Sequence, residues 1–189
     1  MCIRDSYIDG QVLNPEELDL DNQLHRYLLY DAVLTNDSAI VDGKGIGDPT
    51  EYALIEMARK LNVNDDALKE SMNRIEEIPF DSDRKLMSTK YCLHGVPTVL
   101  TKGALDVMLD RTDYIRTSDG VRAITAADKE AILAQNMAFS KKGLRVLAFG
   151  YQEVEKTHVL SLDTEYGFVF LGLISMIDPP REESKAAVA

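Results

Sequence analysis

The sequence predicts an α+β fold, in which an antiparallel β-sheet is flanked by helices. Apolar runs of strand length follow one another closely, as at 86–93 and 97–102, and helical periodicity lies between such runs, as at 125–142. Neighbouring strands with helices inserted between them favour an antiparallel sheet over a parallel one. The 189 residues are enough for one sizeable domain, or for one domain with a fragment of another.

Composition and charge exclude several classes of protein. The chain is 45% hydrophobic and 28% charged, which is typical of a globular protein and not of a disordered one. A net charge of -11 argues against nonspecific nucleic-acid binding and against a polybasic membrane patch. Two cysteines favour a reducing compartment without a disulfide framework. The three histidines lack metal-ligand spacing, so we predict no structural metal site.

The first part of the chain contains a helix and a glycine-rich turn. Residues 1–6 differ in character from the segment after them, and we interpret them as a non-native leader outside the fold. Apolar side chains recur at helical spacing over 21–34, and a short extended piece comes next at 39–41. The turn at 42–47 lies between an extended piece and a helix, as a phosphate-binding loop would. Its glycines have the wrong spacing for such a loop, which favours a plain hairpin turn.

The next helix has a well-marked start. Asp48 is its expected N-cap, Pro49 occupies the first helical position, and Glu51 stands at the capping-box position. A capping-box glutamate needs no further role. The functional alternative for Glu51 is an acceptor for a base amino group at the mouth of a binding site. Residues 65–75 predict a second, more polar helix.

The second half of the chain alternates between strands and helices. A hairpin at 94–96 joins its first two strands, and Gly143 closes its long helix. The predicted elements are strands at 86–93 and 97–102, a short helix to Leu109, a turn at 118–120, a helix from Thr125, and strands at 143–151 and 166–177.

One stretch combines an aromatic ring with two cations. Phe80 follows a proline, and Arg84 and Lys85 come shortly after it. Such residues can hold a flat ring and a negative charge side by side. The aromatic side chain stacks on a nucleobase, and the cations attract the negative charge. The alternatives are a core position for Phe80 and solvated charges for the two cations. A protein this acidic can hold a polyphosphate only where its few cations converge, or where metal ions screen the ligand.

Two more cations lie in or beside predicted strands. Lys102 ends an apolar strand just before Gly103, where a ligand can approach the backbone closely. Its stem is expected along a pocket wall, with the ammonium at the rim. Arg145 alternates with its apolar neighbours, so it projects from the opposite face of its strand. It is either a phosphate contact, to which a guanidinium is well suited, or part of an exposed sheet face.

Taken together and in this order, five motifs resemble the nucleotide-binding domain of P-type cation-transporting ATPases, especially the calcium-pump-like branch. The motifs are GDPTEYAL at 47–54, FDSDRKLMS at 80–88, KGA at 102–104, GLRVLA at 143–148 and DPPR at 178–181. The resemblance runs from about Asp9 to the end of the chain. It implies a nucleotide-binding domain at 7–173, followed at 174–189 by a hinge and the start of the returning phosphorylation domain.

The resemblance also implies roles for individual residues. Phe80 would stack on the adenine, and Glu51 would contact the base edge. Lys85 and Lys102, followed by Gly103, would line the approach of the adenine and the phosphates. The other residues that the resemblance implicates are Arg145 at the phosphates, Leu147 packed on the ring, and Arg181 near the nucleotide in a closed state.

Two departures from the family pattern limit what this chain would do alone. Ser82 stands where many relatives place a basic residue, so Arg84 becomes the candidate to supply that contact. The aspartyl-phosphate motif D-K-T-G-T is absent from this sequence. Covalent phosphoryl transfer needs that carboxylate, and the magnesium that accompanies ATP would be ligated outside this chain. The fragment is therefore expected to bind ATP without hydrolysing it.

The whole protein implied by the resemblance is a membrane pump that couples ATP hydrolysis to cation transport. This domain would face the cytoplasm and work with phosphorylation and actuator domains and with transmembrane helices that lie outside this sequence. The alternative is a free-standing soluble nucleotide-binding module without pump activity. A complete soluble phosphohydrolase is disfavoured, because Pro179 and Pro180 stiffen the segment after Asp178 into a hinge.

Overall fold

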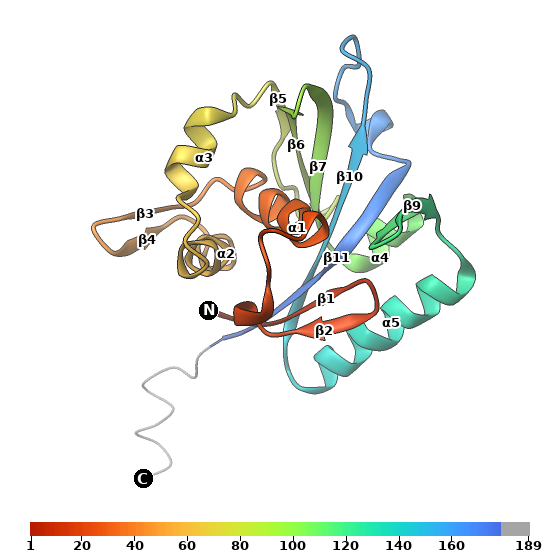
Figure 1. Ribbon diagram of the computed structural model, residues 1–189, viewed down its shortest axis with the longest axis horizontal. Helices are drawn as coiled ribbons and strands as arrows, with labels where there is room; N and C mark the ends of the chain where they lie inside the picture. The colour runs from red at the N-terminus through yellow and green to blue at the C-terminus, as the bar shows by residue number, and fades with distance from the viewer. Residues whose placement is uncertain (179–189) are drawn as a thin grey trace.

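The computed structural model describes residues 1–178 and is built on one twisted, nine-stranded sheet. The strand order is β2-β1-β11-β10-β7-β6-β5, and a β8–β9 hairpin attaches to β11 (Figure 1). Among these residues the pairings are antiparallel, except that of β8 with β11. The strands are β1 (Cys2–Ile8), β2 (Gln11–Leu13), β5 (Glu76–Ile78), β6 (Leu86–Leu93), β7 (Val96–Gly103), β8 (Thr112–Thr117), β9 (Gly120–Ala123), β10 (Arg145–Glu153) and β11 (Phe168–Ile177).

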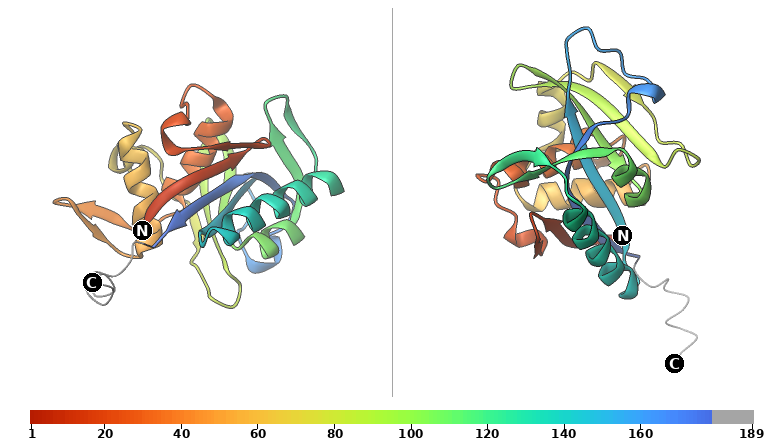
Figure 2. Two further views of the ribbon diagram at one scale, coloured as in Figure 1. Left: turned by 90° about the horizontal axis from the view of Figure 1, so that it is seen from below. Right: turned by 90° about the vertical axis from the view of Figure 1, so that its right-hand side faces the viewer.

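Helices cover both faces of the sheet (Figure 2). The front face carries α1 (Gln23–Leu34), α2 (Pro49–Lys60) and α3 (Asp65–Ser71), and the back face carries α4 (Leu105–Asp110) and α5 (Ala126–Lys141). Each face has its own apolar core: Phe149 packs into the front core and its neighbour Ala148 into the back core. No helix within residues 1–178 combines the length and the apolar character needed to cross a membrane. The predicted α+β class is confirmed.

Local sequence signals placed most helices correctly. The helix predicted at 21–34 is α1, and the Asp48 carboxylate caps α2 by accepting from the N–H groups of Thr50 and Glu51. Thr125 and Asp128 form a capping box at the start of α5. Within the glycine-rich stretch at 42–47, Asp42 and Gly43 form the turn that joins β3 (Ala39–Val41) to β4 (Lys44–Ile46), so the plain hairpin is confirmed.

Two predicted boundaries need correction. Cys2–Ile8 forms β1, which pairs with β11 from Cys2 opposite Ile177 to Tyr7 opposite Leu173, so leaving residues 1–6 out of the fold was wrong. Their origin stays a prediction. The helix predicted at 65–75 ends at Ser71, and the chain then enters edge strand β5. Strand β11 continues to Ile177, with partners on β1 and β10, and the domain boundary at 174 stays a prediction.

Candidate functional site

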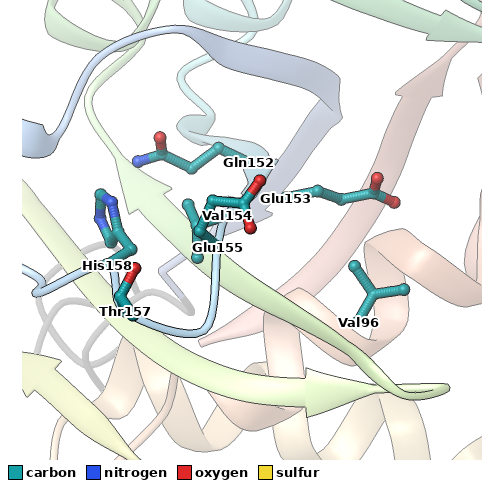
Figure 3. Close-up of a pocket in the computed structure, with 7 residues that line it drawn as sticks. All are labelled: Val96, Gln152, Glu153, Val154, Glu155, Thr157 and His158. Carbon is teal, nitrogen blue, oxygen red and sulfur yellow. The ribbon is translucent and has the colours of Figure 1, made fainter.

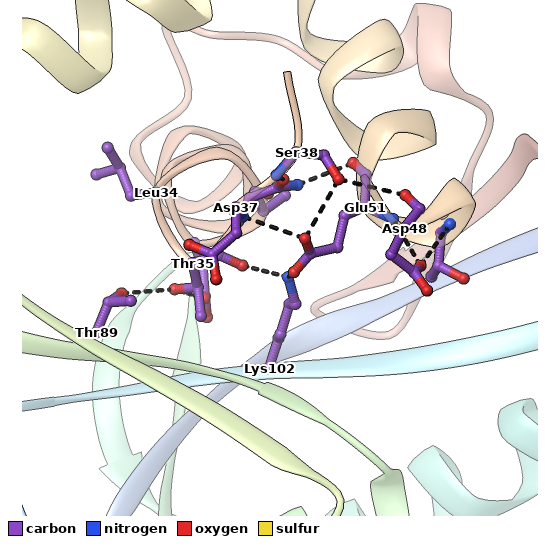
Figure 4. Close-up of polar contacts among 12 residues, drawn as sticks. Leu34, Thr35, Asp37, Ser38, Asp48, Glu51, Thr89 and Lys102 are labelled. Carbon is purple, nitrogen blue, oxygen red and sulfur yellow. Dashed lines mark hydrogen bonds and ion pairs between the residues drawn. The ribbon is translucent and has the colours of Figure 1, made fainter. Parts of the chain in front are cut away.

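The centre of the candidate site is an ion pair between β7 and α2 (Figure 4). Lys102 Nζ lies 2.5 Å from Glu51 Oε1, and it also donates to the backbone carbonyl of Thr35 at the end of α1. The Lys102 side chain is 6% exposed and that of Glu51 is 15% exposed. The ammonium therefore lies under the helices and not at a rim, which corrects the sequence expectation. The Glu51 side chain keeps a small exposed surface.

Glu51 joins three segments of the front face. Its Oε2 accepts from the backbone N–H of Asp37 at 3.1 Å and from Ser38 Oγ at 3.3 Å, while its Oε1 holds Lys102. The carboxylate does not return to the N-cap residue, so the capping-box interpretation of Glu51 was wrong. A tertiary ion pair is the stronger partner, because a charged donor makes a stronger hydrogen bond than a neutral N–H does.

A second acidic side chain is buried near the pair. Asp31 of α1 has no exposed surface, and its Oδ1 accepts from Thr35 Oγ1, which in turn contacts Thr89 Oγ1 at 3.0 Å. Burial raises the pKa of Asp31 well above its usual value, and the nearby Lys102 charge only partly opposes this. Burial also lowers the pKa of Lys102, while Glu51 acts to raise it.

The loop between β5 and β6 carries the aromatic candidate. Phe80 is 58% exposed, so its core alternative is excluded. The Asp81 carboxylate accepts from the N–H groups of Asp83 and Arg84, and its carbonyl accepts from the N–H of Lys85 at 2.6 Å. Lys85 has a left-handed backbone with φ of 62° and an exposed side chain. The loop is thus a compact turn that leaves the Phe80 ring free in solvent.

Gly103 brings this loop against the Lys102 strand. The Lys85 carbonyl accepts from the N–H of Ala104, and Gly103 pairs with Leu86 across the strands. A Cβ at Gly103 would lie 2.2 Å from the Lys85 carbonyl oxygen, so only glycine fits at this junction. Lys85 and Lys102 are thereby held at the same end of β6 and β7.

Arg145, the cation predicted on β10, reaches the same region from the strand next to β7. Arg145 donates to Thr50 Oγ1 at 3.0 Å, at the start of α2 and one residue before Glu51. Leu147 lies two residues on, partly buried against the front core. Residues two apart on a strand share a face, so Arg145 and Leu147 both belong to the front. Arg181 lies outside the described residues.

Arg84 does not belong to the site. Its Nε lies 2.8 Å from Glu165 Oε2, and its side chain is only 11% exposed. We expected Arg84 to join a cation cluster that binds phosphate, or to replace the basic residue that relatives have at the position of Ser82. Both expectations were therefore wrong. Sequence reasoning also missed Glu165, which follows a short 3-10 turn (Leu162–Thr164) and belongs to no motif.

A hollow of about 670 Å³ lies at the opposite end of β7 and β10 from Lys102 (Figure 3). Two of its lining side chains are carboxylates, Glu153 and Glu155, and neither lysine nor arginine lines it. Such a surface repels a polyphosphate. We therefore place the candidate site at Lys102, at the end of β7 where Gly103 and Ala104 contact the loop that carries Phe80.

The fold and this site define a class: an α+β domain that presents a buried lysine–glutamate pair and an exposed aromatic loop at one end of an antiparallel sheet. The sequence profile of the family described as P-type ATPase, cytoplasmic domain N matches residues 25–183. Because this is most of the chain, the protein belongs to that family.

Curated relatives agree with this assignment. The chain is 37% identical over 188 residues to calcium-transporting ATPase 1 of Bacillus cereus, and 41% identical over 192 residues to a calcium-transporting ATPase of Listeria monocytogenes. Calcium-transporting ATPase 1 of Lactococcus lactis is 40% identical over 191 residues. Each match covers 100% of this chain and 21% to 22% of the relative. The chain thus spans about a fifth of the length of these relatives.

Proposed function

We propose that this domain binds ATP at the front of its sheet and serves as the nucleotide-binding part of a cation-transporting P-type ATPase. The observation that carries the proposal is the Lys102–Glu51 pair, which is partly exposed at Glu51 and lies on the strand that contacts the Phe80 loop through Gly103 and Ala104. In an acidic chain, this end of the sheet gathers three cations, Lys85, Lys102 and Arg145.

The proposed pose uses each of these side chains. The adenine stacks on Phe80 and packs on Leu147, and Glu51 accepts from the base amino group. Lys85 and Lys102, beside Gly103, line the approach of the triphosphate, and Arg145 reaches the phosphates. The ligand must compete with Glu51 for the Lys102 ammonium. It gains only the difference between the two interactions, which predicts weak binding.

The chain is proposed to deliver ATP and not to hydrolyse it alone. The acceptor aspartate of the D-K-T-G-T motif would belong to the phosphorylation domain, and an actuator domain and transmembrane helices would complete the pump. Mg²⁺ would arrive with ATP and supply charge screening, held by groups outside this chain. The domain would face the cytoplasm in a protein anchored in the membrane, and a hinge near 174–189 would carry it towards the acceptor.

Calorimetric titration with ATP tests this function through Phe80. The Phe80→Ala variant should lose about 1–3 kcal/mol of ATP-binding free energy, because stacking on the base is lost. Its unfolding free energy should stay unchanged, since Phe80 contributes to neither core. The matched control is Leu162→Ala, because Leu162 is an apolar side chain of equal exposure, 58%, elsewhere on the surface. Equal affinities for wild type and Phe80→Ala would contradict the pose.

A further inference from the structure

The back face of the sheet holds a buried carboxylate that the proposed site does not use. Glu165 has no exposed surface. Its Oε1 accepts from Ser88 Oγ at 2.6 Å, and its Oε2 lies 2.8 Å from Arg84 Nε and 3.6 Å from Arg111 NH1. The Arg84 Nε–H is not aligned on the oxygen, so charge attraction holds this pair more than a directed hydrogen bond does. Two cations thus compensate one buried carboxylate, as burial of a charge requires.

Arg84 links this carboxylate to the loop that carries Phe80. Its NH1 donates to the carbonyl of Pro79 at 3.1 Å, and its NH2 to the carbonyl of Ile78 at 3.4 Å. One guanidinium therefore contacts the two residues that enter the loop and the buried Glu165 at once. A planar group with five donors is suited to such a bridge, and a lysine ammonium is not.

The anchor and the candidate site lie on opposite sides of the same strands. Thr101, which hydrogen bonds to Ser88 behind the sheet, precedes Lys102, whose ammonium lies in front. Successive side chains of a strand point to opposite faces, so the Glu165 cluster stands behind the strands that carry Lys102. The Phe80 loop crosses this edge and is tied from the back while its ring stays free in solvent.

We propose that Glu165 is a positioning residue for nucleotide binding, acting through Arg84 to hold the Ile78–Phe80 entry of the loop, and with it the Phe80 ring, in its binding conformation. The inference rests on the proposed function. Holding the loop in advance spares the ligand the cost of ordering it, which is how preorganisation raises affinity. Glu165 itself touches no ligand. Its effect is therefore confined to the part of the affinity that comes from the base.

The test compares two ligands on the full chain, ATP and inorganic tripolyphosphate, by calorimetry. Glu165→Gln removes the charge that holds Arg84 while keeping the size of the side chain. It should weaken ATP binding about three- to tenfold, a part of the stacking contribution. Tripolyphosphate affinity should not change, because tripolyphosphate has no base to stack on Phe80 and because Lys85 keeps its own backbone hydrogen bonds to Asp81 and Ala104. A residue with a merely structural role would lower both affinities together or neither.

Two further variants keep the test decisive if Glu165→Gln does not fold. Arg84→Lys retains the charge beside Glu165 but cannot bridge it to the Ile78 and Pro79 carbonyls, so it should show the same selective loss of ATP affinity. Arg111→Lys is the matched control, because Arg111 pairs with the same carboxylate without contacting the loop. Its ATP affinity should equal that of the wild type.

The outcomes separate this inference from the proposed function. If the wild type binds ATP and Arg84→Lys binds both ligands as the wild type does, Glu165 does not position the loop. An equal fall for ATP and tripolyphosphate would also overturn the inference, since it would indicate general disruption. Absence of ATP binding by the wild type would overturn the proposed function, and this inference with it.

Discussion

The sheet buries a carboxylate–cation pair on each face, and the two pairs differ in their access to solvent. In front, Glu51 is 15% exposed and holds one cation, Lys102. At the back, Glu165 is fully buried and lies between Arg84 and Arg111. In the proposed site a ligand competes with Glu51 for Lys102, because the Glu51 carboxylate keeps some exposed surface. Nothing from solvent reaches Glu165, so its cations are committed to the fold.

This difference in access to solvent also separates two adjacent cations, Arg84 and Lys85. Arg84 and Lys85 follow one another in the sequence, yet Arg84 turns to the buried carboxylate and Lys85 stays exposed, with Nζ 4.0 Å from Asp106. An exposed pair at that distance contributes little to stability. The Lys85 ammonium is therefore free to contact an anion. The Arg84 guanidinium is instead occupied by Glu165 and by the carbonyls of Ile78 and Pro79.

The largest effect is expected from breaking the back pair. Glu165→Ala leaves Arg84 and Arg111 without their carboxylate and should lower the unfolding free energy by about 3–5 kcal/mol. Chemical denaturation measures this loss. Glu155→Ala is the control, because Glu155 is exposed and should change stability by less than about 0.5 kcal/mol. A loss below about 1 kcal/mol for Glu165→Ala would show that the cluster is not a structural anchor.

A smaller effect is expected from breaking the front pair. Glu51→Ala removes the partner of Lys102, but the ammonium keeps the Thr35 carbonyl and can release its proton, since burial already lowers its pKa. The unfolding free energy should fall by about 1–3 kcal/mol in the same denaturation experiment. Glu56→Ala, an exposed glutamate on the same helix, serves as the control. A loss as large as that of Glu165→Ala would abolish the distinction between the two faces.

The fold could be predicted wherever the determining residues are close together in the sequence. The Asp48 cap, the Thr125 capping box and the hairpin at 94–96 each depend on a few consecutive residues, and each formed as expected. The three-residue strand β5 and the β8–β9 hairpin were missed. Short edge strands owe their existence to the partner strand and not to their own sequence. Unusual composition likewise misled us at residues 1–6, which pair with β11.

The candidate site could be predicted as a set of residues but not as a geometry. Motifs nominated Phe80, Lys85 and Lys102, and the structure brings the two lysines to one end of the sheet, although their roles stay predictions. No local pattern could show that Lys102 pairs with Glu51 or that Arg84 pairs with Glu165. Those partners lie in distant segments, and only the packed sheet brings them together.

The smallest effect, but the one with the most specific pH dependence, is expected at Asp31 behind the front pair. Because its pKa is raised in the folded protein, the folded state binds its proton more tightly than the unfolded state does. Stability from this group is therefore lost as pH rises above its usual value of 3.8 towards the folded-state pKa. The stability of Asp31→Asn relative to the wild type should increase as pH rises.

Thermal unfolding from about pH 5 to pH 8, a range that lies above the usual pKa of aspartate, measures this trend. Asp81→Asn is a control of opposite sign, because the N–H groups of Arg84 and Asp83 lower the pKa of Asp81. The contribution of Asp81 is complete above its usual value of 3.8, so its variant should differ from the wild type by a constant amount. A flat difference for Asp31→Asn as well would show that Asp31 does not titrate in this range.

The central claim is that ATP binds in front of the sheet, at Lys102, and not in the acidic hollow at the other end. Titrating the isotopically labelled chain with ATP and following its amide resonances by NMR tests this most directly. We expect a dissociation constant on the order of 0.1–1 mM, equivalent to about 4–5.5 kcal/mol. The shifts should centre on Phe80, Lys85, Lys102 and Gly103. Shifts confined to residues 152–158, or none at Phe80 and Lys102, would contradict the account.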